Sequence, residues 1–411
     1  MLDVLGHQVF RRLFAAQVVA LAGTGLLTVA LGLLAYDLAG ADAGAVLATA
    51  LAIKMVAYVA VAPLIAALTD RLPRRAVLIT ADAVRAAVAL LLPFVGQTWQ
   101  IYLLIFVLQA ASATFTPAFQ AMIPAVLPDE SDYTRALSLS RLAYDLEALL
   151  SPLLAAAALT VVGYHSLFLG TLAGFLASAL LVLTTPLPAI APPDRSRPLI
   201  ARVLTGARVL GSHPALRGLL ALNLVVASGT GLVMVDTVVF VRDLLHGTDT
   251  GTAVALGCFG AGSMLVALLL PGLLADLPER SLMLTGATVV PAALLFSALL
   301  PAVRPGPGVG WTILVAAWLA LGAGTSMIST PAARLLRRHS GEPGRQAVFT
   351  AQFSLSHACF LLTYPIAGWV AAAAGHTFSM VVLALLATLG SITAARVWPA
   401  HQPAAAAVLV R

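Results

Sequence analysis

Long apolar runs separated by short polar clusters fill almost the whole of the 411-residue chain. A helix needs about 20 apolar residues to span a bilayer, and twelve stretches of this chain reach that length. Short clusters of proline, glycine, aspartate or arginine bound each stretch, as expected at helix ends. The pattern predicts an all-α polytopic membrane protein with twelve transmembrane helices. We expect them near residues 12–36, 43–68, 76–96, 99–127, 135–162, 164–186, 216–241, 250–275, 281–303, 309–334, 347–374 and 376–398.

The second half of the chain repeats the first at an offset of about 206 residues, which grows to about 213 further on. Two parallel membrane repeats, related by an axis along the bilayer normal, are an architecture of secondary transporters with the substrate site between the halves. We therefore predict a six-helix bundle over residues 1–186, a cytoplasmic linker over 187–215 and a second bundle over 216–411. Paired positions include Gln17 with Asn223, Thr24 with Thr230, Asp37 with Asp243, Asp42 with Asp249, and Thr116 with Thr330.

The predicted linker begins with a proline-rich stretch that no spanning helix would tolerate. After it, apolar residues recur at helical spacing between Leu199 and Leu210, with Arg202 and Arg208 interleaved. This spacing predicts a short amphipathic helix on the inner membrane surface. The alternative is a mobile linker with incidental periodicity.

Composition supports a membrane protein and fixes its expected orientation. Hydrophobic residues make up 60% of the chain and charged residues only 10%, against about 25% charged in an average soluble domain. With the N-terminus inside, eighteen arginines fall on the cytoplasmic side, while Arg242 and Arg304 fall outside. This asymmetry follows the positive-inside rule and explains the net charge of +6 without a nucleic-acid partner. We expect a multi-pass protein of a bacterial inner membrane with both termini cytoplasmic.

The loop between the second and third predicted helices carries Asp70 and Arg71, followed four residues later by Arg75. A carboxylate beside guanidinium groups can make paired hydrogen bonds to neighbouring helices. This loop resembles the signature Gly-x-Leu-x-Asp-Arg-x-Gly-Arg-Arg-x-x-Leu of the major facilitator superfamily, and a shorter copy with Asp276 and Arg280 follows the eighth helix. The resemblance, which covers essentially the whole chain, implies two pseudo-symmetric six-helix bundles and places these residues in a cytoplasmic gate that opens and closes with the transport cycle.

A second resemblance is to the bacterial exporter branch that includes enterobactin exporters, macrolide efflux pumps and nickel-resistance permeases. It rests on Phe-Thr-Pro-Ala-Phe-Gln-Ala-Met-Ile-Pro at 115–124 and Leu-Pro-Asp-Glu at 127–130. The chain departs from the superfamily pattern at Ala66 and Pro73, where glycines are usual, and at Gln109, where proton-driven members usually place an arginine. The branch implies export of a small molecule.

Ionisable residues inside spanning helices are costly and are therefore functional candidates. Lys54, the single lysine of the chain, lies about 16 Å into the second helix. On the fifth helix, Arg141 and Asp145 share a face and are expected to form a local ion pair. Glu147 points nearly opposite and needs another partner, either Lys54 or a proton. Together with Asp236 on the seventh helix, these residues are our candidates for proton coupling.

Asp82 and Arg85 lie one turn apart near the inner end of the third helix, where we expect them to join the gate. For every charged candidate the alternative is local neutralisation that only orients helices. Polar residues of the first and seventh helices are candidates for lining a central cavity, together with a histidine on the eleventh. They are Gln17, Thr24, Thr28, Asn223, Thr230 and His357.

Our interpretation is a secondary transporter that works by alternating access and exports a small organic compound in exchange for protons. We expect the chain to act as a monomer in the lipid bilayer. One alternative is a nickel or cobalt exporter, and another is a receptor or scaffold that transports nothing. An enzyme is not expected, because the chain has no His-Glu-x-x-His, Gly-x-Ser-x-Gly or phosphate-loop motif. Neither cysteine shows metal or redox spacing, so we expect no metal site and no cofactor.

Overall fold

The computed structural model describes residues 2–61, 72–188, 207–339 and 345–399. All regular structure in these ranges is helical, which confirms the predicted all-α class. Asp70 and Arg71 of the predicted gate lie outside the described residues, as does most of the linker. Residues 207–212, at the end of the predicted amphipathic segment, are helical.

The described part of the N-terminal half contains six long helices and several short helical turns. A π-helical segment, η3, continues α2 without a break, and Pro93 lies in the short turn η4 that follows α4. The elements are η1 (Leu2–Gly6), α1 (Gln8–Ala39), η2 (Gly40–Asp42), α2 (Ala43–Val56), η3 (Ala57–Val61), α4 (Arg74–Leu91), η4 (Leu92–Phe94), α5 (Thr98–Val126), α6 (Glu130–Leu159) and α7 (His165–Leu183).

The C-terminal half repeats this order. Here the first helix, not the second, continues into a π-helical segment, η5, and a third π-helical segment, η7, follows Pro365. The elements are α9 (Pro214–Val239), η5 (Phe240–Leu244), α10 (Asp249–Asp276), α11 (Glu279–Ser297), α12 (Leu299–Val303), α13 (Pro307–His339), α14 (Arg345–Pro365), η7 (Ile366–Val370), α15 (Ala371–Ala374) and α16 (His376–Val397).

These helices suit a bilayer in length and in surface chemistry. Ten helical segments among the described residues are long and apolar enough to cross a membrane, and the first, Gln8–Val59, contains two of the predicted spans. Together with α6, they are consistent with twelve crossings. Large apolar side chains such as Leu180, Leu268 and Leu385 are more than half exposed on the outer surface. Lipid is the solvent that accepts such a surface, while each helix satisfies its own backbone hydrogen bonds.

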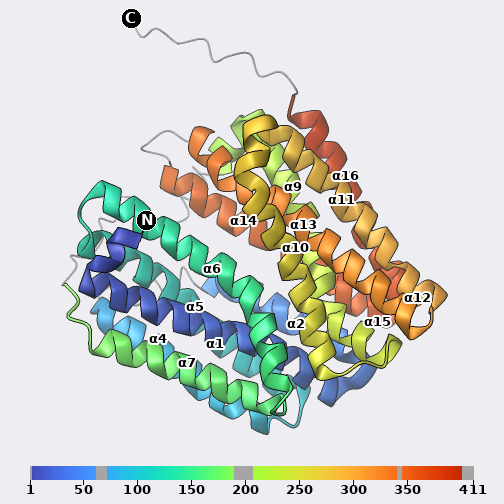
Figure 1. Ribbon diagram of the computed structural model, residues 1–411, viewed down its shortest axis with the longest axis horizontal. Coiled ribbons are helices and arrows are strands. Elements are labelled where there is room, and N and C mark those ends of the chain that lie inside the picture. Colours follow the sequence, from blue (N-terminus) through green and yellow to red (C-terminus); the bar gives the residue numbers. More distant parts are fainter. Residues whose placement is uncertain (1, 62–71, 189–206, 340–344, 400–411) are drawn as a thin grey trace, which may run out of the picture.

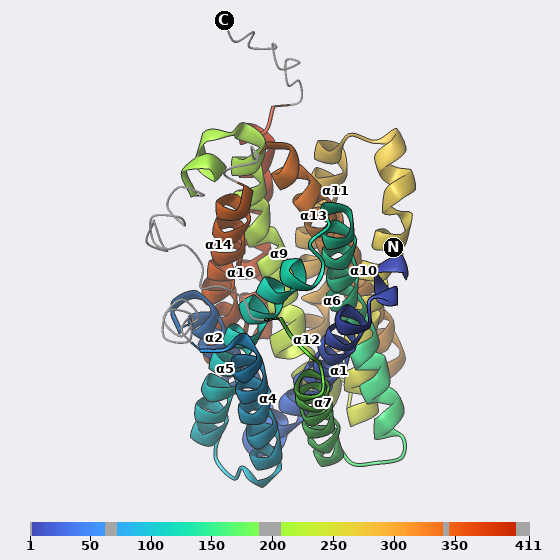
Figure 2. The same cartoon turned by 90° about the vertical axis from the view of Figure 1, so that its left-hand side faces the viewer.

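The two halves meet through two helix pairs, and in each pair a helix of one half packs against a helix of the other half. α6 packs along α10, and α2 packs against α14, η7 and α9. Under the sequence repeat α2 corresponds to α10 and α6 to α14, so each contact is the counterpart of the other. Such reciprocity is the property of a twofold interface. Figure 1 shows the blue-to-green and yellow-to-red helices converging at the lower right and diverging towards the upper left. In the turned view α1, α4, α5 and α7 lie below the C-terminal helices, and α6 extends upward beside α10 (Figure 2).

We call the end of the bundle where the halves converge the closed end and the opposite end the open end. The closed end contains the last turn of α1, the first turn of α2, η5, and the start of α16. The open end contains the start of α1, the start of α4 and the end of α13. The predicted orientation would place the closed end outside the cell.

Candidate functional site

Lys54 on α2 interacts electrostatically with ionisable side chains of both halves. Lys54 follows Ala43, the first residue of α2, by eleven residues, which is about 16 Å along a helix. Its ammonium group interacts electrostatically with Glu147 on α6 and with His357 on α14. The sequence predicted either Lys54 or a proton as the partner of Glu147. The Lys54 ammonium acts electrostatically on the Glu147 carboxylate, and the choice between the two alternatives stays a prediction. The Lys54 ammonium thus connects Glu147 of the N-terminal half electrostatically with His357 of the C-terminal half.

Glu147 lies between α6 and α1. The hydroxyl of Ser151, one turn further along α6, donates a hydrogen bond to its carboxylate. A Cβ atom at Gly25 on α1 would overlap both the Ser151 hydroxyl and the Glu147 carboxylate. The missing side chain of Gly25 thus makes the space in which this carboxyl group lies.

A row of aromatic rings extends from this charged group along α14. The ring of Tyr58 on η3 lies 6.2 Å from that of Phe353 and 5.8 Å from that of His357, measured between centroids. Phe360 continues the row at 6.3 Å from His357, and the Lys54 ammonium lies 5.8 Å from the Tyr58 centroid. Ring faces of this kind bind apolar and cationic groups. Tyr58 comes from one half and the other rings from the other, so the row crosses between the halves.

His357 has a defined hydrogen-bond direction. Its Nδ1 lies 2.7 Å from the carbonyl oxygen of Phe353. A carbonyl only accepts, so Nδ1 carries the hydrogen and Nε2 is left as the acceptor of a neutral ring. His357 can therefore accept a hydrogen bond from a bound molecule.

The structure also places the other residues predicted to line a cavity. Asn223 on α9 and Gln352 on α14 exchange two hydrogen bonds, at 3.3 and 2.9 Å, which join two helices of one half. The hydroxyls of Thr24 and Thr28 donate to backbone carbonyls one turn earlier on α1. Gln17 is buried, with no hydrogen bond to its Oε1 among the described residues. Thr230 is half-buried on α9.

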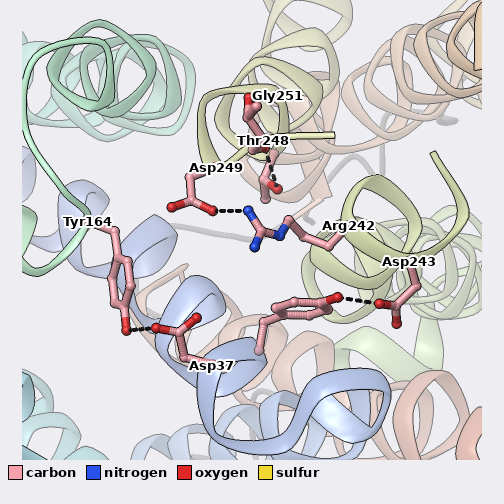
Figure 3. Close-up of polar contacts among 9 residues, drawn as sticks. Asp37, Tyr164, Arg242, Asp243, Thr248, Asp249 and Gly251 are labelled. Carbon is pink, nitrogen blue, oxygen red and sulfur yellow. Dashed lines mark hydrogen bonds and ion pairs between the residues drawn. The ribbon is translucent and has the colours of Figure 1, made fainter. Parts of the chain in front are cut away.

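A polar network joins the halves at the closed end. Tyr36, in the last turn of α1, donates its hydroxyl hydrogen to the carboxylate of Asp243 on η5. The guanidinium of Arg242 lies 5.2 Å from the Tyr36 ring centroid and donates to Asp249 at 2.7 Å. Figure 3 shows Arg242 directed at Asp249 and Tyr164 directed at Asp37. We name Tyr36, Arg242, Asp243 and Asp249 the outer latch, because their contacts tie α1 to the C-terminal half.

Tyr164, where α7 begins, belongs to the same end of the molecule. Its hydroxyl donates to Asp37 of the last turn of α1. Burial raises the pKa of Tyr164, and the bond to Asp37 raises it further. The phenol therefore stays protonated and holds α7 against α1 within the N-terminal half.

Backbones of the two halves approach each other closely beside the latch. A Cβ atom at Gly368 on η7 would overlap the carbonyl oxygen of Gly44 and the Cβ of Ala48, both on α2. One residue on, the indole nitrogen of Trp369 donates to the hydroxyl of Thr49 at 2.9 Å. A glycine is therefore required at 368 for the closed end to shut.

Asp236 on α9 is buried at this contact. Its Oδ1 lies 3.2 Å from Nδ1 of His376, the first residue of α16. A Cβ atom at Gly44 would lie 3.2 Å from the same oxygen. The start of α2 thus covers a carboxyl group that belongs to the other half.

The residues of the predicted gate whose side chains the structure describes make their contacts inside single halves. Arg85 and Asp82 form a buried ion pair on α4, and the Ser178 hydroxyl on α7 donates to Asp82 at 2.7 Å. The guanidinium lies between the rings of Phe115 and Phe175, 4.3 and 4.6 Å from their centroids. This network connects three helices of the N-terminal half.

The two repeated arginines of the loop motif have equivalent partners. Arg75, near the start of α4, donates to the carbonyl of Leu183 at the end of α7. Arg280, near the start of α11, donates to the carbonyls of Trp398 and Ala395 at the end of α16, at 2.7 and 3.1 Å. A cation at a helix C-terminus satisfies free carbonyls and complements the helix dipole. In this state each arginine caps the last helix of its own half.

Some predicted residues remain undescribed, and some important ones were missed. The side chains of Arg141, Asp145 and Asp276 lie outside the described part. Glu279, which the sequence interpretation did not select, pairs with Arg334 at 2.7 Å and Arg338 at 3.5 Å on α13. Tyr36 and His376 were also missed. The one sequence signal for Tyr36 was its position beside the repeated Asp37, and the one for His376 was its position at the start of a span. Among the described residues, no group of three or more His, Cys, Asp or Glu side chains is arranged to hold a metal ion.

Comparison with known proteins agrees with this architecture. Macrolide efflux protein A of Streptococcus pyogenes is 26% identical over 305 residues, which cover 71% of this chain and 73% of that protein. The protein of the same name from Enterococcus faecalis is 27% identical over 257 residues, covering 59% of this chain and 77% of its own.

Solved structures show the same fold at low identity. The nucleoside transporter NupG superposes with a TM-score of 0.72 at 11% identity, over 95% of this chain and 98% of its own. A bacterial homolog of the human lysosomal transporter Spinster, in an inward-facing and unoccupied conformation, gives 0.69 at 14% identity, over 95% and 97%. The family model described as Major Facilitator Superfamily matches residues 13–301. The chain therefore belongs to the major facilitator superfamily and is a membrane transporter.

Proposed function

We propose that this transporter exports a small organic compound across a bacterial inner membrane in exchange for protons. The direction is supported by the relatives named macrolide efflux protein A. The proposal of an organic substrate rests on the aromatic row of Tyr58, Phe353, His357 and Phe360, which offers ring faces rather than a set of metal ligands. The absence of a metal-binding group among the described residues does not favour the nickel or cobalt alternative.

The observation that carries proton coupling is the place of Glu147. Its carboxyl group lies between α6 and α1, accepts a hydrogen bond from Ser151 and is subject to the positive charge of Lys54. Removing a carboxylate from water is costly unless a positive charge or a proton neutralises it. A change in the distance between α2 and α6 changes the influence of Lys54, so the proton affinity of Glu147 changes with the conformation. Linkage of this kind allows a proton gradient to drive a conformational cycle.

The cycle we propose is alternating access about the outer latch. In the described state the closed end is shut by the latch and by the Gly44–Gly368 contact. We propose that this end faces outward and that both termini are cytoplasmic, as the arginine distribution predicts. Substrate then enters from the open end, and opening of the latch releases it outside. Both halves of the site come from one chain, so we propose that the monomer is sufficient.

The test is transport in vesicles that contain the purified protein. Substrates are first selected by comparing accumulation of a panel of lipophilic compounds, nickel and cobalt in cells with and without the gene. The proposal predicts lower accumulation of organic compounds in expressing cells. It predicts that an imposed proton gradient drives the same compounds across vesicle membranes and that a protonophore abolishes the movement. Movement of nickel or cobalt alone, or movement unaffected by the protonophore, would contradict the proposal.

A further inference from the structure

Asp236 and His376 form a buried acid–base pair that the cycle described above does not use. Asp236 is fully buried on α9, and His376 is about one-quarter exposed at the start of α16. Their Oδ1 and Nδ1 atoms lie 3.2 Å apart, but neither carboxylate oxygen receives a well-directed hydrogen bond from a described residue. The edge of the Phe240 ring also borders His376, with centroids 5.3 Å apart. The pair is therefore poorly supplied with donors that would stabilise a carboxylate.

The cover over this pair comes from the other half of the protein. Gly44 in the first turn of α2 borders Oδ1 of Asp236, and the Cα of Gly368 on η7 lies beside the same glycine. This is the close contact that shuts the closed end. Separation of α2 from η7 and α9 at this contact would uncover Asp236.

Other charged groups near the pair are largely matched to each other. On η5, Asp243 acts electrostatically on His376, but it also accepts the Tyr36 hydroxyl hydrogen. Arg242 pairs with Asp249 of α10. Asp37 of α1 accepts from Tyr164, and α2 and η7 contribute Gly44 and Gly368 at the contact. Movement of α2 over the pair therefore acts mainly on the charge shared by Asp236 and His376, because the neighbouring charged groups already have partners.

The number of protons bound to Asp236 and His376 determines the charge that is covered when the closed end shuts. With one proton, the pair is neutral overall, either as carboxylic acid with imidazole or as carboxylate with imidazolium. With none, it carries one negative charge, and covering an uncompensated charge is strongly unfavourable. We propose that Asp236 and His376 form a second proton-binding site, at the outer latch, which must bind one proton before the closed end can shut.

This inference deepens the proposed function, because it assigns a step of the proton exchange to a site away from Glu147. It rests on that proposal for the physiological role of the proton. Closure itself is an equilibrium that can be measured without substrate or gradient, so failure of one claim is distinguishable from failure of the other.

The experiment measures closure by distance between two spin labels as pH is varied. Labels are attached to cysteines at the exposed positions Ala41 and Ala374, on opposite halves of the closed end, in a chain with Cys258→Ala and Cys359→Ala. The protein is studied in lipid nanodiscs between pH 5 and pH 9. The proposal predicts that the short-distance population grows as pH falls. One coupled proton changes the ratio of shut to open molecules by up to about tenfold per pH unit.

Variants identify the responsible group. Asp236→Asn should shut at neutral and alkaline pH and lose the rise in closure as pH falls, because its neutral amide needs no proton. His376→Gln should move the transition to lower pH, since the carboxyl must then take the proton alone. Glu147→Gln should keep the pH dependence of closure, and Asp243→Asn should weaken closure at every pH without flattening the curve. A rise in closure at falling pH that survives Asp236→Asn, or one abolished by Glu147→Gln or Asp243→Asn, would overturn the proposal.

Discussion

The phenol of Tyr36 donates a hydrogen bond to Asp243, the repeat counterpart of Asp37, which is the residue next to Tyr36 in the chain. The repeat counterpart of Tyr36 is Arg242, whose guanidinium lies over the Tyr36 ring. Duplication thus supplied both sides of the contact from the same stretch of sequence, and divergence of position 36 from position 242 made them complementary. The outer latch is a junction between former copies.

Replacing Tyr36 by phenylalanine keeps the ring beneath Arg242 but removes the hydrogen bond to Asp243. A hydrogen bond to a charged group contributes about 1.5–3 kcal/mol, so we expect the shut-to-open ratio to fall by about tenfold or more. Labels at Ala41 and Ala374 should report more of the longer distance. An unchanged distribution would show that the latch does not hold the closed end.

Gly368 offers a steric test of the same contact. Gly368→Ala places a methyl group against the backbone of Gly44 and the side chain of Ala48, so the closed end should fail to shut fully. We expect the protein to fold, to show longer label distances and to transport slowly. Gly32→Ala is the matched control, because a Cβ at that position on α1 meets open space. Equal effects of the two substitutions would argue against a steric clash between the added methyl group and α2.

The buried pair of Asp82 and Arg85 predicts strong non-additivity in stability. Either Asp82→Asn or Arg85→Gln alone leaves an uncompensated buried charge, which costs about 3–5 kcal/mol. The double variant removes both charges and should be more stable than either single variant. The stabilities of the three variants are compared by heating each in detergent and measuring the loss of its monodisperse peak in size-exclusion chromatography. If the double variant loses as much as the sum of the single losses, the two groups do not act as a pair.

Two histidines at the open end predict a loss of stability in acid. The ring of His213, just before α9, lies 4.0 Å from that of His339, measured between centroids. Burial lowers the pKa of His213, and the nearby His339 lowers it further. The unfolded chain then binds more protons below about pH 6.5, so stability falls as pH drops from there towards the lowered pKa.

His213→Gln should reduce this acid-induced loss of melting temperature between pH 7 and pH 5. His246→Gln, at an exposed position in the loop after η5, should leave the loss as it is in the unmodified protein. The interpretation fails if His213→Gln and the parent protein lose stability in parallel.

Much of the fold was predictable because lipid imposes a simple rule on sequence. Apolar length decides which segments span, and the spacing of Gly23, Thr24 and Gly25 against Gly229, Thr230 and Gly231 exposed the duplication. The depth of Lys54 and Glu147 was likewise a matter of counting residues from helix ends. These quantities are local to the chain, so residue spacing alone determines them.

Contacts between residues of different halves were harder to predict, because they depend on how one half is placed against the other. The sequence marked Asp37 and Asp243 as equivalent but contained no sign that Tyr36 would bridge to Asp243 or that Gly44 would cover Asp236. The arginines of the loop motif were recognised, but backbone carbonyls at a helix end have no sequence signature, so the capping role of Arg75 and Arg280 was missed. Asp236 was selected, whereas its neighbour His376 resembled an ordinary helix start.

Glu147 is the group through which we propose that a proton enters the transport cycle, and its replacement is the most direct test. Vesicles containing Glu147→Gln or the parent protein are compared in two assays with one selected compound: accumulation driven by a proton gradient, and exchange of labelled for unlabelled compound without a gradient. We predict that the variant loses driven accumulation while it keeps exchange, since the halves still move. Accumulation by the variant that matches the parent protein would contradict proton coupling through Glu147.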